Sequence, residues 1–312
     1  MSSYIFGIDI GGTTVKCGLF TAQGELLEKW EIPTSREDAG ANVLPDVAAA
    51  VLDKMKEKNI AKEDVAGIGV GVPGPVRDDG TVLKCANLGW GITSVNTILQ
   101  ELTGLKVRVA NDANVAALGE MWKGGGRGFD DVIMITLGTG VGGGVIVGGR
   151  IVAGSNGAGG EIGHIIINPA ETDVCGCGGH GHLEQYASAT GIVRMAKKRL
   201  AADDSSTALR EYSELTAKVI FDCAKQKDKV ACELVDMLGS YLALALTHVA
   251  ATVDPQVFVI GGGVSKAGQI LLDAVSRHYN ENILYALRNK EFRLAELGND
   301  AGIYGSARLV IA

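Results

Sequence analysis

The chain has 312 residues, more than the roughly 250–300 at which a single core usually stops growing, so we expect two domains. Apolar residues make up 46% and charged residues 21%, and a net charge of −7 without a basic block argues against a nucleic-acid surface. Glycine is in excess, with 44 residues against a usual share of ~7%, and it clusters after short apolar runs.

The N-terminus and the longest apolar run predict a cytoplasmic protein without a membrane partner. Residues 1–10 have the pattern of a strand, not of a signal peptide. The run 234–253 contains an aspartate and a histidine, so it is predicted to be a buried core helix and not a membrane span. Among six cysteines only Cys175 and Cys177 are close in sequence, which favours metal binding or redox chemistry over a disulfide framework.

The first half of the chain alternates strands and helices. YIFGIDI, VKCGLF and ELLEKWEI, joined by tight turns, predict an antiparallel meander. Apolar spacing then predicts a helix, a buried strand and a second helix at 43–58, 65–72 and 94–103. Gly104 suits the C′ position of that second helix, and Asn111 or Asp112 can cap the helix that follows the strand LKVRVA.

The pattern of strand, glycine turn and strand begins again after residue 126, in DVIMITLGTGVGGGVIVGGRIV. At an offset of 127, Ile8–Gly11 aligns with Ile135–Gly138, and both turns carry threonine and glycine. This weak internal repeat predicts two domains of related build.

A polar loop, 154–184, follows the repeat, and the run HIIIN within it is an expected strand. Several helices come next, then the strand QVFVIGGG, a helix from Ser265, a short strand near 292–297 and a closing helix. Strands that alternate with helices indicate an α/β protein.

Three glycine turns are candidate nucleotide ligands: DIGGTTVK, LGTGVGGG and GGGVS. Backbone N–H groups of such turns can face phosphate oxygens, and Asp9 at a strand end can hold Mg²⁺ through water. The third turn could cover the base and ribose. The predicted nucleotide-binding residues are Asp9, Gly11, Gly12, Thr13, Thr14, Gly138, Thr139, Gly140, Gly261, Gly262 and Gly263.

Each turn alone is also explained as a hairpin or a strand–helix connection that needs glycine for its backbone angles. The first two turns match neither the P-loop nor the dinucleotide-binding fingerprint. Three such turns on a duplicated plan favour one nucleotide held between two lobes.

In their order along the chain, nine segments resemble the ROK family of bacterial sugar kinases, within the hexokinase and actin-like ATPase superfamily: DIGGTTVK, GVPGPV, NLGW, NDANVAALGE, LGTGVGGG, NGAGGEIGH, CGCGGHGHLE, ASATGI and GGGVS. They span residues 9–265, and within the family the chain is similar to ATP-dependent glucokinases. The resemblance implies a two-domain α/β fold of the actin-like ATPase and hexokinase (ribonuclease H-like) type, with a ligand cleft between the lobes. The expected domains are a smaller N-terminal one, 1–118 plus 300–312, and a larger one, 119–299.

The resemblance also assigns roles to single residues. Asp112 resembles the family's catalytic base, since a carboxylate within reach of the sugar 6-hydroxyl can accept its proton. A helix cap is the plain alternative, and both hold if Asn111 caps while Asp112 faces the substrate. The residues that resemble the family's sugar contacts are Asn87, Asn111, Asp112, Glu161, His164 and Glu184.

The family's zinc loop reads C-x-C-G-x-x-G-C-x-E, and three cysteines plus the histidine of E-x-G-H bind the metal. Cys175 and Cys177 match this loop, but His182 stands where the third cysteine is expected. The implied site is a closed, structural Cys₂His₂ set that aims the sugar-binding residues, formed by His164, Cys175, Cys177 and His182. Three alternatives stay open: a redox pair, His180 in place of His182, and loss of zinc binding.

The implied reaction is the ATP-dependent phosphorylation of D-glucose at its 6-hydroxyl, with ATP, Mg²⁺ and a structural Zn²⁺, in a homodimer or homotetramer. A kinase for N-acetylmannosamine, N-acetylglucosamine, mannose or fructose is an alternative, and polyphosphate could replace ATP. A sugar-responsive regulator is disfavoured, because family members of that class carry a DNA-binding motif ahead of the first strand, which only three residues precede here.

Overall fold

The structure, a computed structural model, describes residues 3–311, and the chain forms two compact units. Unit 1 comprises Met1–Asp130, Gly144–Gly160 and Leu297–Ala312, and unit 2 comprises Asp131–Gly143 and Glu161–Glu296. The expected domains differ from these units mainly in assigning 119–130 and 144–160 to the second domain. The expected cleft between the lobes stays a prediction.

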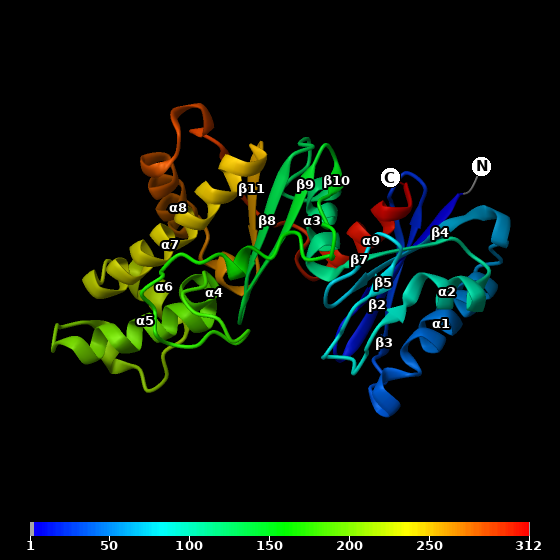
Figure 1. Ribbon diagram of the computed structural model, residues 1–312, viewed down its shortest axis with the longest axis horizontal. Coiled ribbons are helices and arrows are strands. Elements are labelled where there is room, and N and C mark those ends of the chain that lie inside the picture. The colour runs from blue at the N-terminus through cyan, green and yellow to red at the C-terminus, as the bar shows by residue number, and fades with distance from the viewer. Residues whose placement is uncertain (1–2, 312) are drawn as a thin grey trace. The chain divides into compact units, whose positions relative to one another are not determined.

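The first sheet has the strand order β3-β2-β1-β4-β7 and lies in unit 1 (Figure 1). Its strands are β1 (Tyr4–Ile10), β2 (Thr14–Thr21), β3 (Leu26–Pro33), β4 (Val65–Val72) and β7 (Val107–Asn111). The first three strands form the predicted antiparallel meander, and β4 and β7 run parallel to β1. A two-stranded hairpin, β5 (Thr81–Val82) with β6 (Thr93–Ser94), follows β4.

Helices cover both faces of this sheet, because its strands alternate their apolar side chains. Phe6 and Ile8 on β1 join the larger core, which also contains the apolar faces of α1 (Val43–Glu57) and α2 (Val95–Thr103). Ile5 instead packs with Ile303 of α9 (Ala301–Ile311). Helix α3 (Asp112–Lys123) completes the unit, and Gly104 caps α2 in the left-handed conformation, as predicted.

The second sheet repeats the plan of the first, with the order β10-β9-β8-β11-β12. Its strands are β8 (Val132–Leu137), β9 (Val141–Val147), β10 (Arg150–Ile151), β11 (Val257–Gly261) and β12 (Glu291–Leu294). As in the first sheet, a glycine turn joins the first two strands, and a later strand pairs in parallel with the first of them. The equal order confirms the predicted repeat.

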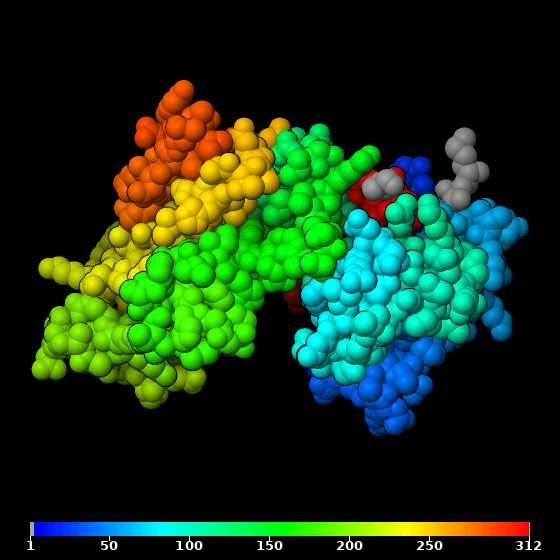
Figure 2. Space-filling view, in the orientation of Figure 1, coloured from blue at the N-terminus to red at the C-terminus, as the bar shows by residue number. Residues whose placement is uncertain are grey.

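The helices of unit 2 are α4 (Glu184–Ala187), α5 (Ala189–Ala202), α6 (Ala217–Lys225), α7 (Lys229–Val253) and α8 (Gln269–Asn282). By length and composition alone α7 could cross a membrane, yet 61% of its most apolar window is buried inside the fold. It therefore has the burial of the predicted core helix. In the space-filling view, the yellow and orange residues of α7 and α8 form one continuous part of this unit (Figure 2).

Two local predictions in unit 2 were wrong. The run HIIIN forms no strand in the described chain: Ile162–His164 is a short 3-10 helix, and an isolated bridge joins Ile166 to His182. Backbone groups of the run form hydrogen bonds with the glycine-rich loop instead, for example from the Ile167 N–H to the Gly181 carbonyl. The helix expected from Ser265 begins only at Gln269, as α8, and Ser265 itself lies in a separate 3-10 helix, Gly263–Ala267.

Candidate active site

The site in unit 1 begins where β7 ends. Asn111 caps α3, as predicted, because its Oδ1 accepts the backbone N–H groups of Ala113 at 2.9 Å and Asn114 at 3.1 Å. Its Nδ2 donates to the carbonyl oxygen of Gly74, just past β4, at 3.0 Å. Adjacent parallel strands bring their carboxyl ends to one edge of the sheet, so this hydrogen bond ties two strand ends together.

Asp112 is the first residue of α3, and two donors fix its carboxylate. Oδ1 accepts from the backbone N–H of Ala113 at 2.8 Å and from Nδ2 of Asn111 at 3.0 Å. A second carboxylate is near: burial raises the pKa of Asp9 to about 6, Lys16 opposes this, and the Asp112 charge adds to it. The structure thus brings the predicted base and the predicted magnesium-binding carboxylate into electrostatic contact.

The first glycine turn follows β1 at the same edge. The N–H of Gly11 donates to the carbonyl of Thr14 at 3.0 Å, which closes the turn. Asn87 lies beside the turn, since a Cβ added at Gly12 would be 3.9 Å from the Cβ of Asn87. Unit 1 therefore assembles its four groups of predicted residues: the turn, Asp9, Asn87 and the pair Asn111–Asp112.

Four metal-ligand side chains gather in unit 2. One ligand atom of each lies within 4.8 Å of all the others, in the set His164, Cys175, Cys177 and His182. Cys177 Sγ is 3.2 Å from His182 Nδ1, and both cysteines are free thiols. Ligand atoms bonded to Zn²⁺ at about 2.0–2.3 Å in a tetrahedron lie roughly 3.3–3.8 Å apart, so this set fits the ion after a small contraction.

The loop geometry favours His182 over His180 as the fourth ligand. His180 Nδ1 lies 3.2 Å from the carbonyl oxygen of Asp173, so a backbone partner engages this ring. His182 lies against Gly179, where an added Cβ would be 2.5 Å from the imidazole. Glycine at 179 thus lets the His182 ring approach the cysteines.

The predicted sugar-binding residues of unit 2 lie around this metal-ligand set. Glu161 Oε2 is 3.8 Å from His164 Nε2, and both side chains are partly exposed. Glu184 begins α4, and its Oε2 accepts the backbone N–H of Val141 at 3.0 Å. Its Oε1 is 3.8 Å from Cys175 Sγ. Glu184 therefore lies between the metal-ligand loop and the second glycine turn.

The second and third glycine turns follow adjacent parallel strands, β8 and β11. In the second turn, the N–H of Gly138 donates to the carbonyl of Gly140 at 3.0 Å. In the third, Gly262 has a φ of 83°, and an added Cβ would lie 2.5 Å from the carbonyl oxygen of Leu137. Only glycine allows this close approach of the two turns.

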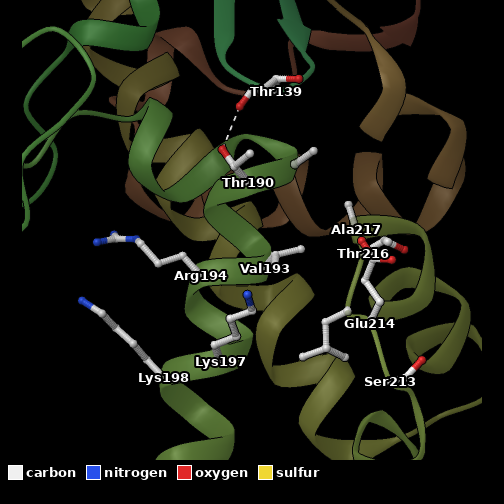
Figure 3. Close-up of a pocket in the computed structure, with 12 residues that line it drawn as sticks. Thr139, Thr190, Val193, Arg194, Lys197, Lys198, Ser213, Glu214, Thr216 and Ala217 are labelled. Atoms are coloured by element: carbon white, nitrogen blue, oxygen red, sulfur yellow. Dashed lines mark hydrogen bonds between the residues drawn. The ribbon is translucent and has the colours of Figure 1, made fainter.

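A cavity of about 720 Å³ opens beside the second turn (Figure 3). Thr190 Oγ1 donates to the carbonyl oxygen of Thr139 at 2.8 Å, which holds α5 against that turn. The cavity is lined by Thr139, Ala189, Thr190, Val193, Arg194, Lys197, Lys198, Ser213, Glu214, Leu215, Thr216 and Ala217. Its volume and mixed lining suit the base and ribose of a nucleotide whose phosphates lie at the turn.

The sequence did not indicate this cavity; it favoured the third turn for the base and ribose, which stays a prediction, and none of that turn's glycines lines the cavity. The lining residues of α5 belong to no phosphate-binding motif. The available signal was helical spacing, because positions 190, 194 and 197 lie three and four residues apart and carry the polar side chains of Thr190, Arg194 and Lys197.

Comparisons with known proteins show what the chain is similar to. The model of the ROK family matches residues 5–312. A glucokinase of Halalkalibacterium halodurans is 44% identical over 309 residues, which cover 97% of this chain and 94% of the relative.

Solved structures of ROK family proteins are also similar to this chain. A ROK hexokinase from Thermus thermophilus is 32% identical with a TM-score of 0.79, and the match covers 98% of this chain and 97% of that chain. A ROK family glucokinase from Streptomyces griseus, in complex with glucose and AMPPNP, is 35% identical with a TM-score of 0.73 over 98% of both chains.

Proposed function

The chain belongs to the ROK family, and from this premise we propose that it transfers the γ-phosphoryl group of ATP to the 6-hydroxyl of D-glucose. The observation that carries the proposal is the 44% identity with a glucokinase over 97% of this chain. A solved relative in complex with glucose and AMPPNP supports the same pair of substrates.

Unit 1 supplies the proton acceptor. Asp112 takes the proton of the 6-hydroxyl as the new O–P bond forms and the bond between the β- and γ-phosphates breaks, with ADP as the leaving group. Two donors already orient its carboxylate, so the group needs little reorganisation. Asn87 and Asn111 provide amide groups that pair with sugar hydroxyls.

The glycine turns and Asp9 serve the nucleotide. The phosphate oxygens would lie at the turns Gly11–Thr14 and Gly138–Gly140, with threonine hydroxyls and backbone N–H groups other than those of Gly11 and Gly138, which close the turns, as donors. Asp9 would hold Mg²⁺, whose charge would offset the burial that raises the pKa of this carboxyl. The cavity beside α5 takes the base and ribose.

Unit 2 supplies the remaining sugar contacts, Glu161, His164 and Glu184. A Zn²⁺ ion would be held by the four-ligand set, where it fixes the ring of His164 and the loop ahead of Glu184. Four protein ligands close its coordination sphere, so the ion is structural and takes no part in the chemistry.

An ADP-release assay with glucose tests the proposal, with glucose 6-phosphate detected as the product. We expect the largest kcat/KM for glucose among a panel that includes mannose, fructose, N-acetylglucosamine and N-acetylmannosamine. A larger value for another sugar would identify a different hexose kinase, and no turnover of any sugar would contradict the kinase assignment. Polyphosphate in place of ATP tests the donor.

Cytoplasmic location and a homodimer or homotetramer stay predictions. Light scattering coupled to size-exclusion chromatography measures the oligomeric state directly.

A further inference from the structure

Arg194 lies on α5 one turn after Thr190 and borders two cavities. One is the proposed nucleotide cavity, which Arg194 helps to line, although its side chain leaves α5 on the side away from Glu214 and Thr216 (Figure 3). The other, of about 340 Å³, is lined by Cys175 and Glu184 as well as by Arg194. Thr190 and Arg194 thus line both cavities, the proposed nucleotide cavity and the one beside the metal-ligand loop.

The guanidinium of Arg194 is committed to the segment that leads into the metal-ligand loop. Nη2 lies 2.9 Å from Oε2 of Glu171, and Nη1 lies 2.7 Å from Oδ2 of Asp173. The group also sits over the ring of Tyr186, 5.0 Å from the ring centroid. The second of these carboxylates belongs to a residue only two positions before Cys175, the first metal-ligand cysteine.

Glu171 makes this contact costly to lose, because its side chain is only 8% exposed. The hydroxyl of Tyr186 donates to its Oε2 at 2.6 Å, and the backbone N–H of Asp173 donates to its Oε1 at 3.0 Å. The hydrogen bond from Tyr186, with help from Asp173 N–H and Arg194, lowers the pKa of Glu171 to about 2. Without Arg194 this carboxylate would keep its hydrogen bonds, but the cation left beside it would be Lys198, 3.9 Å from Oε1, so its charge would be less well compensated.

We propose that Arg194 is a positioning residue that fastens the segment 171–175 to α5 and thereby holds Cys175 in place for the metal. The same helix is fastened to the second glycine turn by Thr190. Arg194 therefore connects the metal centre to the wall of the nucleotide cavity. This inference rests on the zinc site and the sugar kinase function proposed above.

The alternative role for an arginine at this cavity is direct contact with phosphate. Both terminal nitrogens of Arg194 already pair with carboxylates. Lys197 lies three residues further along α5 and lines the same cavity, but it has no ion pair among the described residues. Lys198, the third cation of this wall, pairs with Asp173 at 2.6 Å but is 59% exposed. Lys197 is accordingly the matched control, since it lines the same cavity without a link to the metal-ligand loop.

The test compares Arg194→Met with Lys197→Met in zinc affinity, measured by competition with a chromophoric chelator and without substrates. We expect Arg194→Met to lower zinc affinity about 10-fold or more, the size seen when a residue that supports a metal ligand is lost. Lys197→Met leaves the affinity unchanged. At limiting zinc, Arg194→Met raises the KM for glucose and leaves the KM for ATP near the wild-type value, and excess zinc restores the KM for glucose.

Unchanged zinc affinity in Arg194→Met would overturn the proposal, and a raised KM for ATP in that case would assign the residue to phosphate. Glu171→Gln is the second variant in case Arg194→Met fails to fold: it removes the buried charge, keeps the side-chain volume and should weaken zinc binding in the same direction. The zinc readout is independent of turnover, so a chain without glucose kinase activity could still confirm the role of Arg194.

Discussion

The two sheets share one strand order, yet the functional side chains that accompany them are held in different ways. In unit 1, Asp9 lies on β1, Asn111 ends β7 and Asp112 begins α3. In unit 2, Glu161 and His164 lie in a described stretch, residues 161–183, whose one regular element is the 3-10 turn Ile162–His164. The sheet and a helix cap hold the first group, whereas the second is held by a few loop hydrogen bonds, such as Ile167 N–H to the Gly181 carbonyl, and by the proposed metal.

The largest expected effect is the loss of kcat in Asp112→Asn, which separates proton transfer from the positioning of substrate in unit 1. Asp112→Asn removes the proton acceptor but keeps the side-chain shape and the Asn111 cap, so we expect kcat to fall about 10²- to 10⁴-fold. The zinc content and the binding of glucose, measured by calorimetry, should remain close to wild type. Steady-state kinetics of phosphorylation provide the measurement.

Near-normal turnover by Asp112→Asn would show that this carboxylate is only a structural part of the helix start. In that case unit 1 would lack a proton acceptor at the end of β7, and the comparison between the units would lose its chemical basis.

Removal of the metal should affect only the second group of residues. We expect a chelator, or Cys175→Ser, to raise the KM for glucose about 10- to 100-fold, because the ligand set no longer fixes His164 and the loop before Glu184. Hydrogen exchange should accelerate across 161–184 and stay unchanged across 107–123. Equal acceleration in both segments would mean that the metal stabilises the whole chain and not one site.

The sequence was sufficient to predict the elements that carry the unit 1 site. Strand β4 and helix α3 lie where apolar spacing and the Asn111 cap place them, because local patterns specify both. The HIIIN run misled, since its β-branched residues suit a strand but the loop offers only an isolated bridge at Ile166.

The cavity beside α5 was only partly foreshadowed: the segment ASATGI contains Ala189 and Thr190 of its wall, but the rest of the wall joins residues from separate elements without a motif. Arg194 shows the reason: its partners Glu171 and Asp173 lie far away in sequence, and nothing in the spacing of charges indicates that they meet. The glycine turns were recognisable, but the packing of Gly262 against Leu137 depends on tertiary contact.

A smaller effect tests whether the cap alone fixes the end of β7. Asn111→Ala removes the acceptor for two backbone N–H groups and the donor to Gly74, so we expect the free energy of unfolding to fall by about 1–2 kcal/mol. Asn111→Ser keeps a capping hydroxyl and should lose less stability. Urea unfolding measures both variants.

The two variants also separate the cap from sugar binding. If Asn111 contacts the sugar, both should raise the KM for glucose by a similar factor despite their different stabilities. A KM that follows stability would restrict Asn111 to the cap.

The smallest expected effect concerns Asp9, whose burial raises its pKa from 3.8 to about 6. The charge of Lys16 lowers this pKa, and the charge of Asp112 raises it further. The folded state favours the protonated form, so this contribution to stability is fully present below pH 3.8 and is lost as the pH rises through about 6. Relative to Asp9→Asn, which cannot ionise, the wild type without Mg²⁺ or nucleotide should lose on the order of 1 kcal/mol between pH 5 and pH 8.

Urea unfolding at the two pH values measures this difference, with Asp78→Asn, an exposed carboxylate of the same unit, as the control. An added Cβ at Gly302 of α9 would lie 2.4 Å from Oδ2 of Asp9, so the helix packs directly on one side of this half-buried carboxylate and removes part of its hydration. Saturating Mg²⁺ and ATP should stabilise the wild type at pH 8 more than Asp9→Asn. If Mg²⁺ and ATP stabilise both proteins equally, the Asp9 carboxylate does not contribute to binding the metal.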